Sequence, residues 1–104
     1  MGKPNTRYYY KGSQLKQLRA FCNAARLGSV TRAAEALFLS QPAVSLQLGA
    51  LQNEMGVKLF ERQGRRLSLT PEGEILYELA QPLMDGMDAL DDEFRDRLRG
   101  MSAG

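Results

Sequence analysis

The sequence predicts a mainly α-helical fold: three short helices, a two-stranded hairpin and one long final helix. Apolar residues recur at helical spacing through most of the chain, capping residues mark four helix starts, and two strand-like runs flank a Gln-Gly turn. Only a short turn separates the second and third helices, which makes them a helix-turn-helix. The hairpin beside it is a wing. The predicted architecture is therefore a winged helix-turn-helix followed by a long helix.

The composition argues for one binding domain rather than an enzyme. With 104 residues, 43% of them hydrophobic and 25% charged, the chain supports one compact domain plus a projecting element. It has no His and a single Cys, so the usual parts of zinc sites, acid–base catalysis and nucleophilic triads are missing. We therefore predict no catalytic residue, no metal ligand and no cofactor in this chain.

The expected location is the cytoplasm. A single cysteine, Cys22, fits a reducing compartment, and its place on an apolar helix face favours a buried structural thiol over a reactive one. The sequence shows no signal peptide and no apolar run long enough to cross a bilayer, so we expect no membrane partner.

The charge is divided along the chain. Residues 1–70 hold 11 Lys and Arg against three acids, a net charge of +8. Residues 71–104 hold three Arg against nine acids, a net charge of −6. This division predicts a front that faces a polyanion and a rear that avoids nucleic acid.

Residues 1–12 form a basic and aromatic arm before the first helix. Tyr8–Tyr10 lie between Arg7 and Lys11, an arrangement that could follow a phosphate backbone. The arm could instead pack on the domain, for example as a short strand, and this second interpretation is favoured.

The domain itself is expected over residues 13–70. Ser13 is a plausible N-cap for a first helix that ends at Leu27 before Gly28, and Thr31 is the expected cap of the second helix. The inner side of the first helix is predicted to consist of Leu15, Leu18, Phe21, Cys22 and Ala25.

The third helix, which starts after Ser40, has two different faces. Val44, Leu48, Leu51 and Met55 follow the spacing of a core stripe. The other face carries no charge and can hydrogen-bond or touch a base edge, which suggests a recognition helix; it consists of Gln41, Pro42, Ser45, Leu46 and Gly49. On these residues alone, an ordinary amphipathic helix in a small bundle explains the pattern as well as a recognition helix does.

The hairpin adds cations beside this uncharged face. Val57–Glu61 and Arg66–Leu69 are the two strand-like runs, and Arg62, Arg65 and Arg66 gather at the tip. A solvated basic turn is the alternative. We favour a phosphate-binding wing because the recognition helix has no charge of its own and needs cations from elsewhere.

A long linker helix is predicted over residues 71–99, with residues 100–104 as a flexible tail. Thr70, Pro71 and Glu72 form a strong helix start, and Pro82 is expected to bend the helix. The helix is longer than the domain is wide, so most of its apolar seam must meet another chain. The predicted dimerisation residues are Leu76, Ala80, Leu83, Met87, Leu90 and Phe94.

Four motifs in order give the chain a resemblance to the amino-terminal domain of LysR-type transcriptional regulators. They are Gly28–Leu37 (GSVTRAAEAL), Ser40–Ser45 (SQPAVS), Leu59–Arg62 (LFER) and Leu69–Gly73 (LTPEG), and the resemblance covers roughly residues 15–98. It implies a winged helix-turn-helix, an antiparallel dimer through the linker helix and binding to an interrupted inverted repeat near a promoter. It also implies a missing second domain that senses a small-molecule effector, and we expect a tetramer for the full-length protein.

The resemblance also implies roles for single residues. Gln41, Pro42 and Ser45 would contact DNA from the recognition helix, Arg65 would reach the minor groove, and Ser29 or Thr31 would meet phosphate. The chain departs from the family at Leu46, where many members carry Arg, and at Gly49, where a polar or basic residue is usual.

The predicted function is sequence-specific binding of double-stranded DNA by a dimer associated with the nucleoid. The alternative is a protein-interaction adaptor that pairs through the long helix. Salt dependence separates them, because an adaptor should not bind duplex DNA more tightly as salt falls. The full set of predicted DNA-binding residues is Ser29, Thr31, Arg32, Ser40, Gln41, Pro42, Ser45, Leu46, Gln47, Lys58, Arg62, Arg65 and Arg66.

Overall fold

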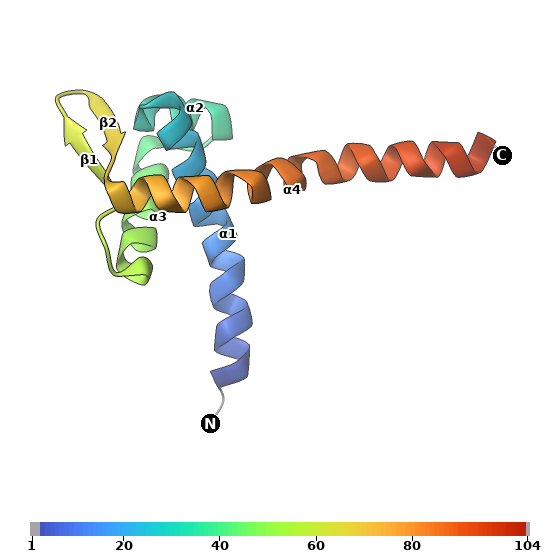
Figure 1. Cartoon of the computed structure of the whole chain (residues 1–104), viewed down its shortest axis with the longest axis horizontal. Coiled ribbons are helices and arrows are strands. Elements are labelled where there is room, and N and C mark those ends of the chain that lie inside the picture. Colours follow the sequence, from blue (N-terminus) through green and yellow to red (C-terminus); the bar gives the residue numbers. More distant parts are fainter. Residues whose placement is uncertain (1–2, 104) are drawn as a thin grey trace.

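The computed structural model describes the backbone of residues 3–103 and the side chains of residues 14–102. Its elements are α1 (Lys3–Leu27), α2 (Val30–Leu37), α3 (Gln41–Met55), β1 (Phe60–Gln63), β2 (Arg66–Leu69) and α4 (Pro71–Ala103). Figure 1 shows α2, α3, the two-stranded wing and the C-terminal half of α1 gathered at one end, with the N-terminal half of α1 and most of α4 projecting away from them. The predicted winged helix-turn-helix with a long final helix is confirmed.

The first helix begins earlier than predicted. It starts at Lys3 rather than after Ser13, so residues 3–12 are helical and do not form a strand. Pro4 lies in the first turn, where its missing N–H costs no hydrogen bond, and this start signal outweighs the cap at Ser13. The side chains of Tyr8–Tyr10 lie outside the described residues. The predicted end is correct, since Gly28 follows Leu27 with a φ of +65°.

Caps define both helices of the helix-turn-helix. The cap of α2 is Ser29 rather than Thr31, because the Ser29 hydroxyl accepts the Arg32 N–H at 3.1 Å. Ser40 caps α3 as predicted and accepts the Ala43 N–H at 3.2 Å. Gly56 closes α3 in the left-handed conformation that glycine adopts without strain.

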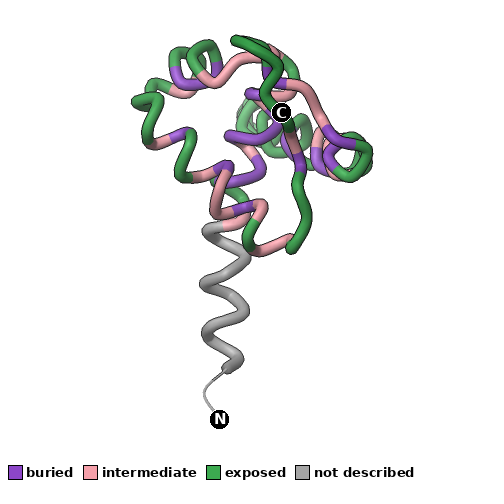
Figure 2. Tube along the Cα trace, turned by 90° about the vertical axis from the view of Figure 1, so that its left-hand side faces the viewer, coloured by how far each residue is buried: buried purple, intermediate pink, exposed green. Residues whose placement is uncertain are grey.

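The core forms where α1, α2, α3 and the start of α4 meet, and Figure 2 shows the buried segments at the centre of the domain. Val44, Leu48 and Leu51 are buried as predicted. On α1, Leu18, Phe21 and Cys22 are buried, but Leu15 is 40% exposed, and Ala25 is only half-buried. The inner face of α1 is therefore rotated toward Gln17, whose Nε2 donates to Glu54 Oε2 at 2.8 Å.

Cys22 is the buried thiol that its apolar surroundings predict. Burial, with a smaller contribution from the nearby charge of Asp85, raises the pKa of Cys22 to about 11 against the opposing effect of Arg19. The thiol is therefore protonated at neutral pH, which makes it a poor nucleophile.

The wing is shorter than predicted at its start. The first strand begins at Phe60 rather than Val57, and it pairs antiparallel with β2 in a register that sets Phe60 opposite Leu69 and Gln63 opposite Arg66. The preceding residues are tied to helices instead. The Leu59 N–H donates to Gln52 Oε1 at 2.8 Å, and Lys58 O accepts the Thr70 hydroxyl at 2.6 Å.

The long helix starts at the predicted cap, where Thr70 Oγ1 accepts the Gly73 N–H at 3.0 Å. It is continuous through Pro82 and runs to Ala103, so the predicted end at residue 99 and the flexible segment over residues 100–103 are wrong. Met101 and Ala103 follow Gly100, and both residue types are good helix formers. An Arg19–Asp88 ion pair of 2.8 Å ties α4 to α1.

The apolar seam of α4 also needs one correction. Ala80 is 1% exposed and packs in the core of its own domain, while Leu76 is partly buried against the same core. The domain packs against the side of α4 that carries Leu76 and Ala80, so neither residue is available to a second chain. The large apolar side chains that remain exposed on α4 are Ile75, Leu79, Leu83, Met87, Leu90, Phe94, Leu98 and Met101.

Candidate nucleic-acid interface

The outer face of α3 is exposed and uncharged. Gln41, Pro42, Ser45 and Leu46 are all exposed, whereas Val44, Leu48 and Leu51 are buried. The first charged residue along α3 is Glu54, near its far end. This face can therefore offer hydrogen bonds and apolar contacts, but it cannot offer an ionic contact to phosphate.

A single groove joins this helix to the wing. It is lined by residues of three elements: Ser29, Val30 and Thr31 at the start of α2, Gln41 at the start of α3, and Arg62, Arg65, Arg66 and Leu67 from the wing. Among the described side chains, none of the three arginines forms an ion pair with a carboxylate. Their positive charge is therefore available to a ligand in or above the groove.

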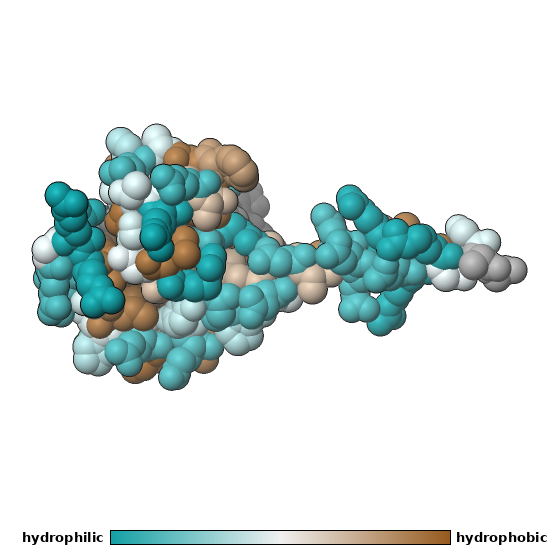
Figure 3. Space-filling view, turned by 90° about the horizontal axis from the view of Figure 1, so that it is seen from above, coloured by the Kyte–Doolittle hydropathy of each residue, from teal (hydrophilic) through white to brown (hydrophobic). Residues whose placement is uncertain are grey.

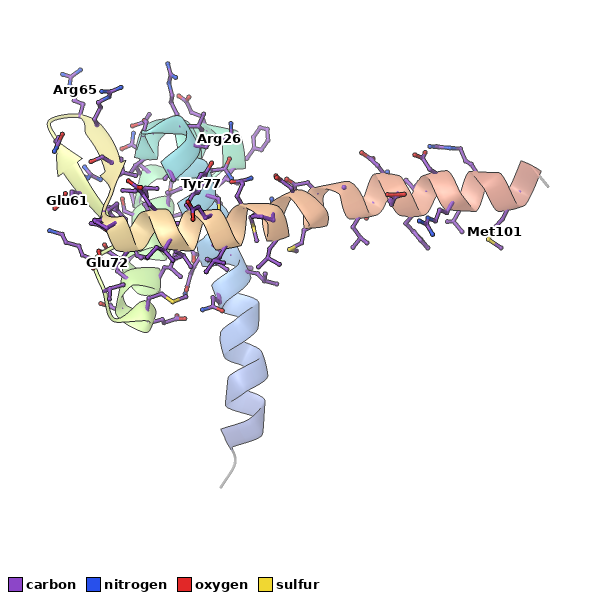
Figure 4. All side chains as sticks on the ribbon, in the orientation of Figure 1. Arg26, Glu61, Arg65, Glu72, Tyr77 and Met101 are labelled. Atoms are coloured by element: carbon purple, nitrogen blue, oxygen red, sulfur yellow. The ribbon has the colours of Figure 1, made fainter. Side chains whose placement is uncertain are left out.

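A backbone hydrogen bond holds the wing beside α2. The Leu67 N–H donates to Gly28 O at 3.2 Å, and the Leu67 side chain is buried in the core. Because Arg66 directly precedes Leu67, this contact places the basic tip next to the α1–α2 turn. Figure 4 shows Arg65 projecting outward from the tip, away from the domain. Seen from above in Figure 3, the wing end of the domain is covered by hydrophilic side chains.

The start of α2 adds anion-binding groups to the same groove. The first N–H groups of a helix have no partner within the helix, and the helix dipole makes this end positive. Ser29 uses one lone pair for the cap, so its hydroxyl proton is still available, and Thr31 and Arg32 are exposed. A phosphate placed here could receive backbone, hydroxyl and guanidinium donors together.

Six of the thirteen predicted DNA-binding residues line this groove, and two of the others, Gln47 and Lys58, line different pockets. Gln47 is half-buried and lines a different pocket, with Leu37, Leu39 and Met87, because residue 47 lies on another side of α3 from Gln41. Gln47 is therefore not placed to read a base from this face. Lys58 is exposed near the far end of α3, beside Asn53 and Gly56, so any phosphate that it contacts is separate from those at the wing.

Sequence reasoning missed part of the exposed stripe on α4. Ile75, Leu79, Leu98 and Met101 continue the stripe that Leu83, Met87, Leu90 and Phe94 begin. The spacing of four residues from Ile75 to Met87 was a readable signal. A seam drawn through Leu76 and Ala80 follows equally good spacing, and only the packing of the domain distinguishes the two.

The helix-turn-helix and wing of this chain match a known protein family. The model described as the bacterial regulatory helix-turn-helix protein, lysR family, matches residues 15–74, which include the whole helix-turn-helix and the wing. The chain belongs to the LysR family. The resemblance read from its motifs is therefore confirmed.

Curated members of the LysR family match most of the chain. The RuBisCO operon transcriptional regulator of Allochromatium vinosum is 42% identical over 90 residues, which cover 86% of this chain and 30% of that protein. The HTH-type transcriptional activator CmpR of Synechocystis sp. is 38% identical over 94 residues, covering 90% of this chain and 31% of that protein. The chain thus spans about a third of the length of these relatives.

Solved LysR-family structures share the fold. A BenM DNA-binding domain in complex with benA site 1 DNA is 34% identical, with a TM-score of 0.69 over 79% of this chain and 95% of that one. A CbnR DNA-binding domain in complex with DNA is 33% identical, with a TM-score of 0.66 over 85% of this chain and 97% of that one. A Corynebacterium glutamicum OxyR C206 mutant has a TM-score of 0.73 at 35% identity, over 79% of this chain and 26% of that one.

Neither a metal-binding cluster nor a membrane-spanning helix is found over the described residues. Within that part of the chain, no group of three or more His, Cys, Asp or Glu side chains is placed to hold a metal ion. None of the helices described there is both long enough and apolar enough to span a bilayer.

Proposed function

We propose that this chain binds double-stranded DNA sequence-specifically as the DNA-binding region of a LysR-family transcriptional regulator. The observation that carries the proposal is the groove in which the uncharged start of α3 meets three wing arginines without ion-pair partners. A helix with a polar, uncharged face can contact base edges in the major groove, and cations beside it can bind the phosphates of the DNA backbone. The solved complexes of similar domains with DNA support the same assignment.

The residues divide into two roles under this proposal. Gln41, Pro42, Ser45 and Leu46 read base edges from the major groove, and Arg65 enters the adjacent minor groove. The contacts to phosphate come from Ser29, Thr31, Arg32, Ser40, Arg62 and Arg66, with Lys58 on a separate phosphate. Since phosphate contacts position the protein and base contacts specify the sequence, substitutions in the two sets should have different effects.

We propose that two copies bind together, paired antiparallel through α4. The exposed stripe from Ile75 to Met101 extends for about 39 Å along the helix. An apolar surface of this length is expected to be buried against another protein surface. A two-fold axis between the copies would present two α3 helices to an inverted repeat in a promoter. For the longer protein we propose a tetramer, a small-molecule effector bound outside this chain, and a cytoplasmic, nucleoid-associated location.

Salt dependence tests the proposed function. For wild type, the logarithm of the association constant should fall steeply as the logarithm of the salt concentration rises. Arg65→Ala should weaken binding and reduce this slope by about one unit, because one fewer cation displaces counterions from the DNA. Fluorescence anisotropy with a labelled duplex at several salt concentrations measures both quantities.

Arg95→Ala is the matched control, since Arg95 is an exposed arginine in the C-terminal half of α4. Its slope should equal that of wild type. An unchanged slope in Arg65→Ala would remove the wing tip from the interface. Binding that does not strengthen as salt falls, in wild type itself, would favour the adaptor over the DNA-binding protein.

A further inference from the structure

Leu46 stands on the outer face of α3 among small apolar neighbours. Its side chain is 75% exposed, although it belongs to a helix whose inner leucines are fully buried. The four residues that flank it one turn away, at positions −4, −3, +3 and +4, are Pro42, Ala43, Gly49 and Ala50. None of them carries a polar side chain, so this part of the helix offers neither a hydrogen-bond donor nor an acceptor.

Gly49 keeps the space beside Leu46 open. A Cβ atom built on Gly49 would meet no other atom within 4 Å, so the glycine is not needed for packing inside the domain. Glycine within a helix is destabilising relative to alanine. The missing side chain lowers the helix surface next to Leu46, and this lets the helix approach a ligand until the leucine touches it.

Resting on the proposed function, we infer that Leu46 reads the C5-methyl group of one thymine in each half-site. The major groove presents donors and acceptors at every base pair, but its apolar feature is the thymine methyl group. A leucine with only Pro, Ala and Gly around it can gain from that methyl group and from no polar base edge. Ser45 and Gln41 then read the hydrogen-bonding groups of neighbouring bases.

The experiment begins with a binding selection on a duplex library that has a randomised central region. Wild type should recover an inverted repeat with a thymine at one fixed position of each half-site. Each thymine is then replaced by deoxyuridine, which removes only the methyl group. At the position that Leu46 reads, affinity should fall about fourfold per half-site, the value expected for one buried methyl group.

Leu46→Ala supplies the comparison, and its exposed position keeps the core intact, which thermal unfolding checks. This variant should bind the thymine and deoxyuridine duplexes equally well. Ser45→Ala, its neighbour on the same face, should keep the fourfold methyl effect while changing preference elsewhere in the half-site. Leu46→Arg should recover guanine in a new selection, since Arg pairs with the acceptors of that base.

The possible failures are distinguishable. If wild type recovers no preferred duplex sequence, the proposed function itself is wrong. If wild type recovers a sequence but every deoxyuridine replacement acts equally on wild type and Leu46→Ala, only the inference about Leu46 is overturned. A selected half-site without thymine at a Leu46-sensitive position overturns it in the same way.

Discussion

Leu90→Glu is expected to convert the proposed dimer to a monomer. Leu90 is 64% exposed and lies near the middle of the apolar stripe on α4. In an antiparallel pair centred between residues 88 and 89, Leu90 of each copy faces Met87 of the other. In the Leu90→Glu protein, both copies would place a carboxylate against an apolar surface, which lowers the free energy of dimerisation. The loss of two buried leucine side chains lowers it further.

The same change should weaken DNA binding without touching the DNA-binding face. A dimer binds the second half-site as an intramolecular step, and losing that step reduces affinity by about a hundredfold or more. Sedimentation equilibrium measures the oligomeric state, and anisotropy with duplexes of one and two half-sites measures affinity. Binding to the single half-site should be unchanged.

Ala89→Glu is the matched control, because it adds the same charge one residue away on a part of α4 that is exposed but off the stripe. It should remain a dimer. A Leu90→Glu protein that sediments as a dimer would show that the stripe is covered by something other than a second copy.

The stripe also shows what the sequence alone could and could not predict. The two faces of α3 were predictable because a cap at each end and a regular apolar spacing fix both the length and the rotation of a short helix. On α4, two parallel apolar lines fit helical spacing. The choice between Leu76–Ala80 and Ile75–Leu79 depends on which face of α4 is turned toward the domain, which is set by tertiary contacts such as Arg19–Asp88.

Long-range side-chain contacts account for the other differences. The first strand was predicted to begin at Val57 because residues 57–61 are a strand-like run before the Gln-Gly turn. The Gln52 side chain instead accepts the Leu59 N–H, a contact that no local propensity reveals. The groove at the wing was easier to predict. The cations that could reach phosphate lie close together in the sequence, and the Gly28–Leu67 hydrogen bond only fixes their distance from α2.

Gly73→Ala should cost the protein about 3 kcal/mol of unfolding free energy, the upper part of the range for overpacking. A Cβ atom on Gly73 would lie 1.9 Å from Leu59 O, far inside any allowed contact. That carbonyl cannot move freely, because it accepts the Thr70 N–H at 3.1 Å in the connection between the wing and α4. Relief of the clash therefore requires the wing or α4 to shift.

Urea and thermal unfolding at a fixed protein concentration measure the effect, which should appear as a fall in Tm of about 15 °C. Gly86→Ala is the control on the same helix, since a Cβ there meets no atom within 4 Å. That change should stabilise the helix by up to about 1 kcal/mol. Equal destabilisation by both changes would mean that α4 needs glycine for a reason other than its contact with Leu59. A Gly73→Ala protein as stable as wild type would mean that the wing and α4 are joined more loosely than these contacts indicate, and the arginines at the wing tip would then lack a fixed position relative to α3.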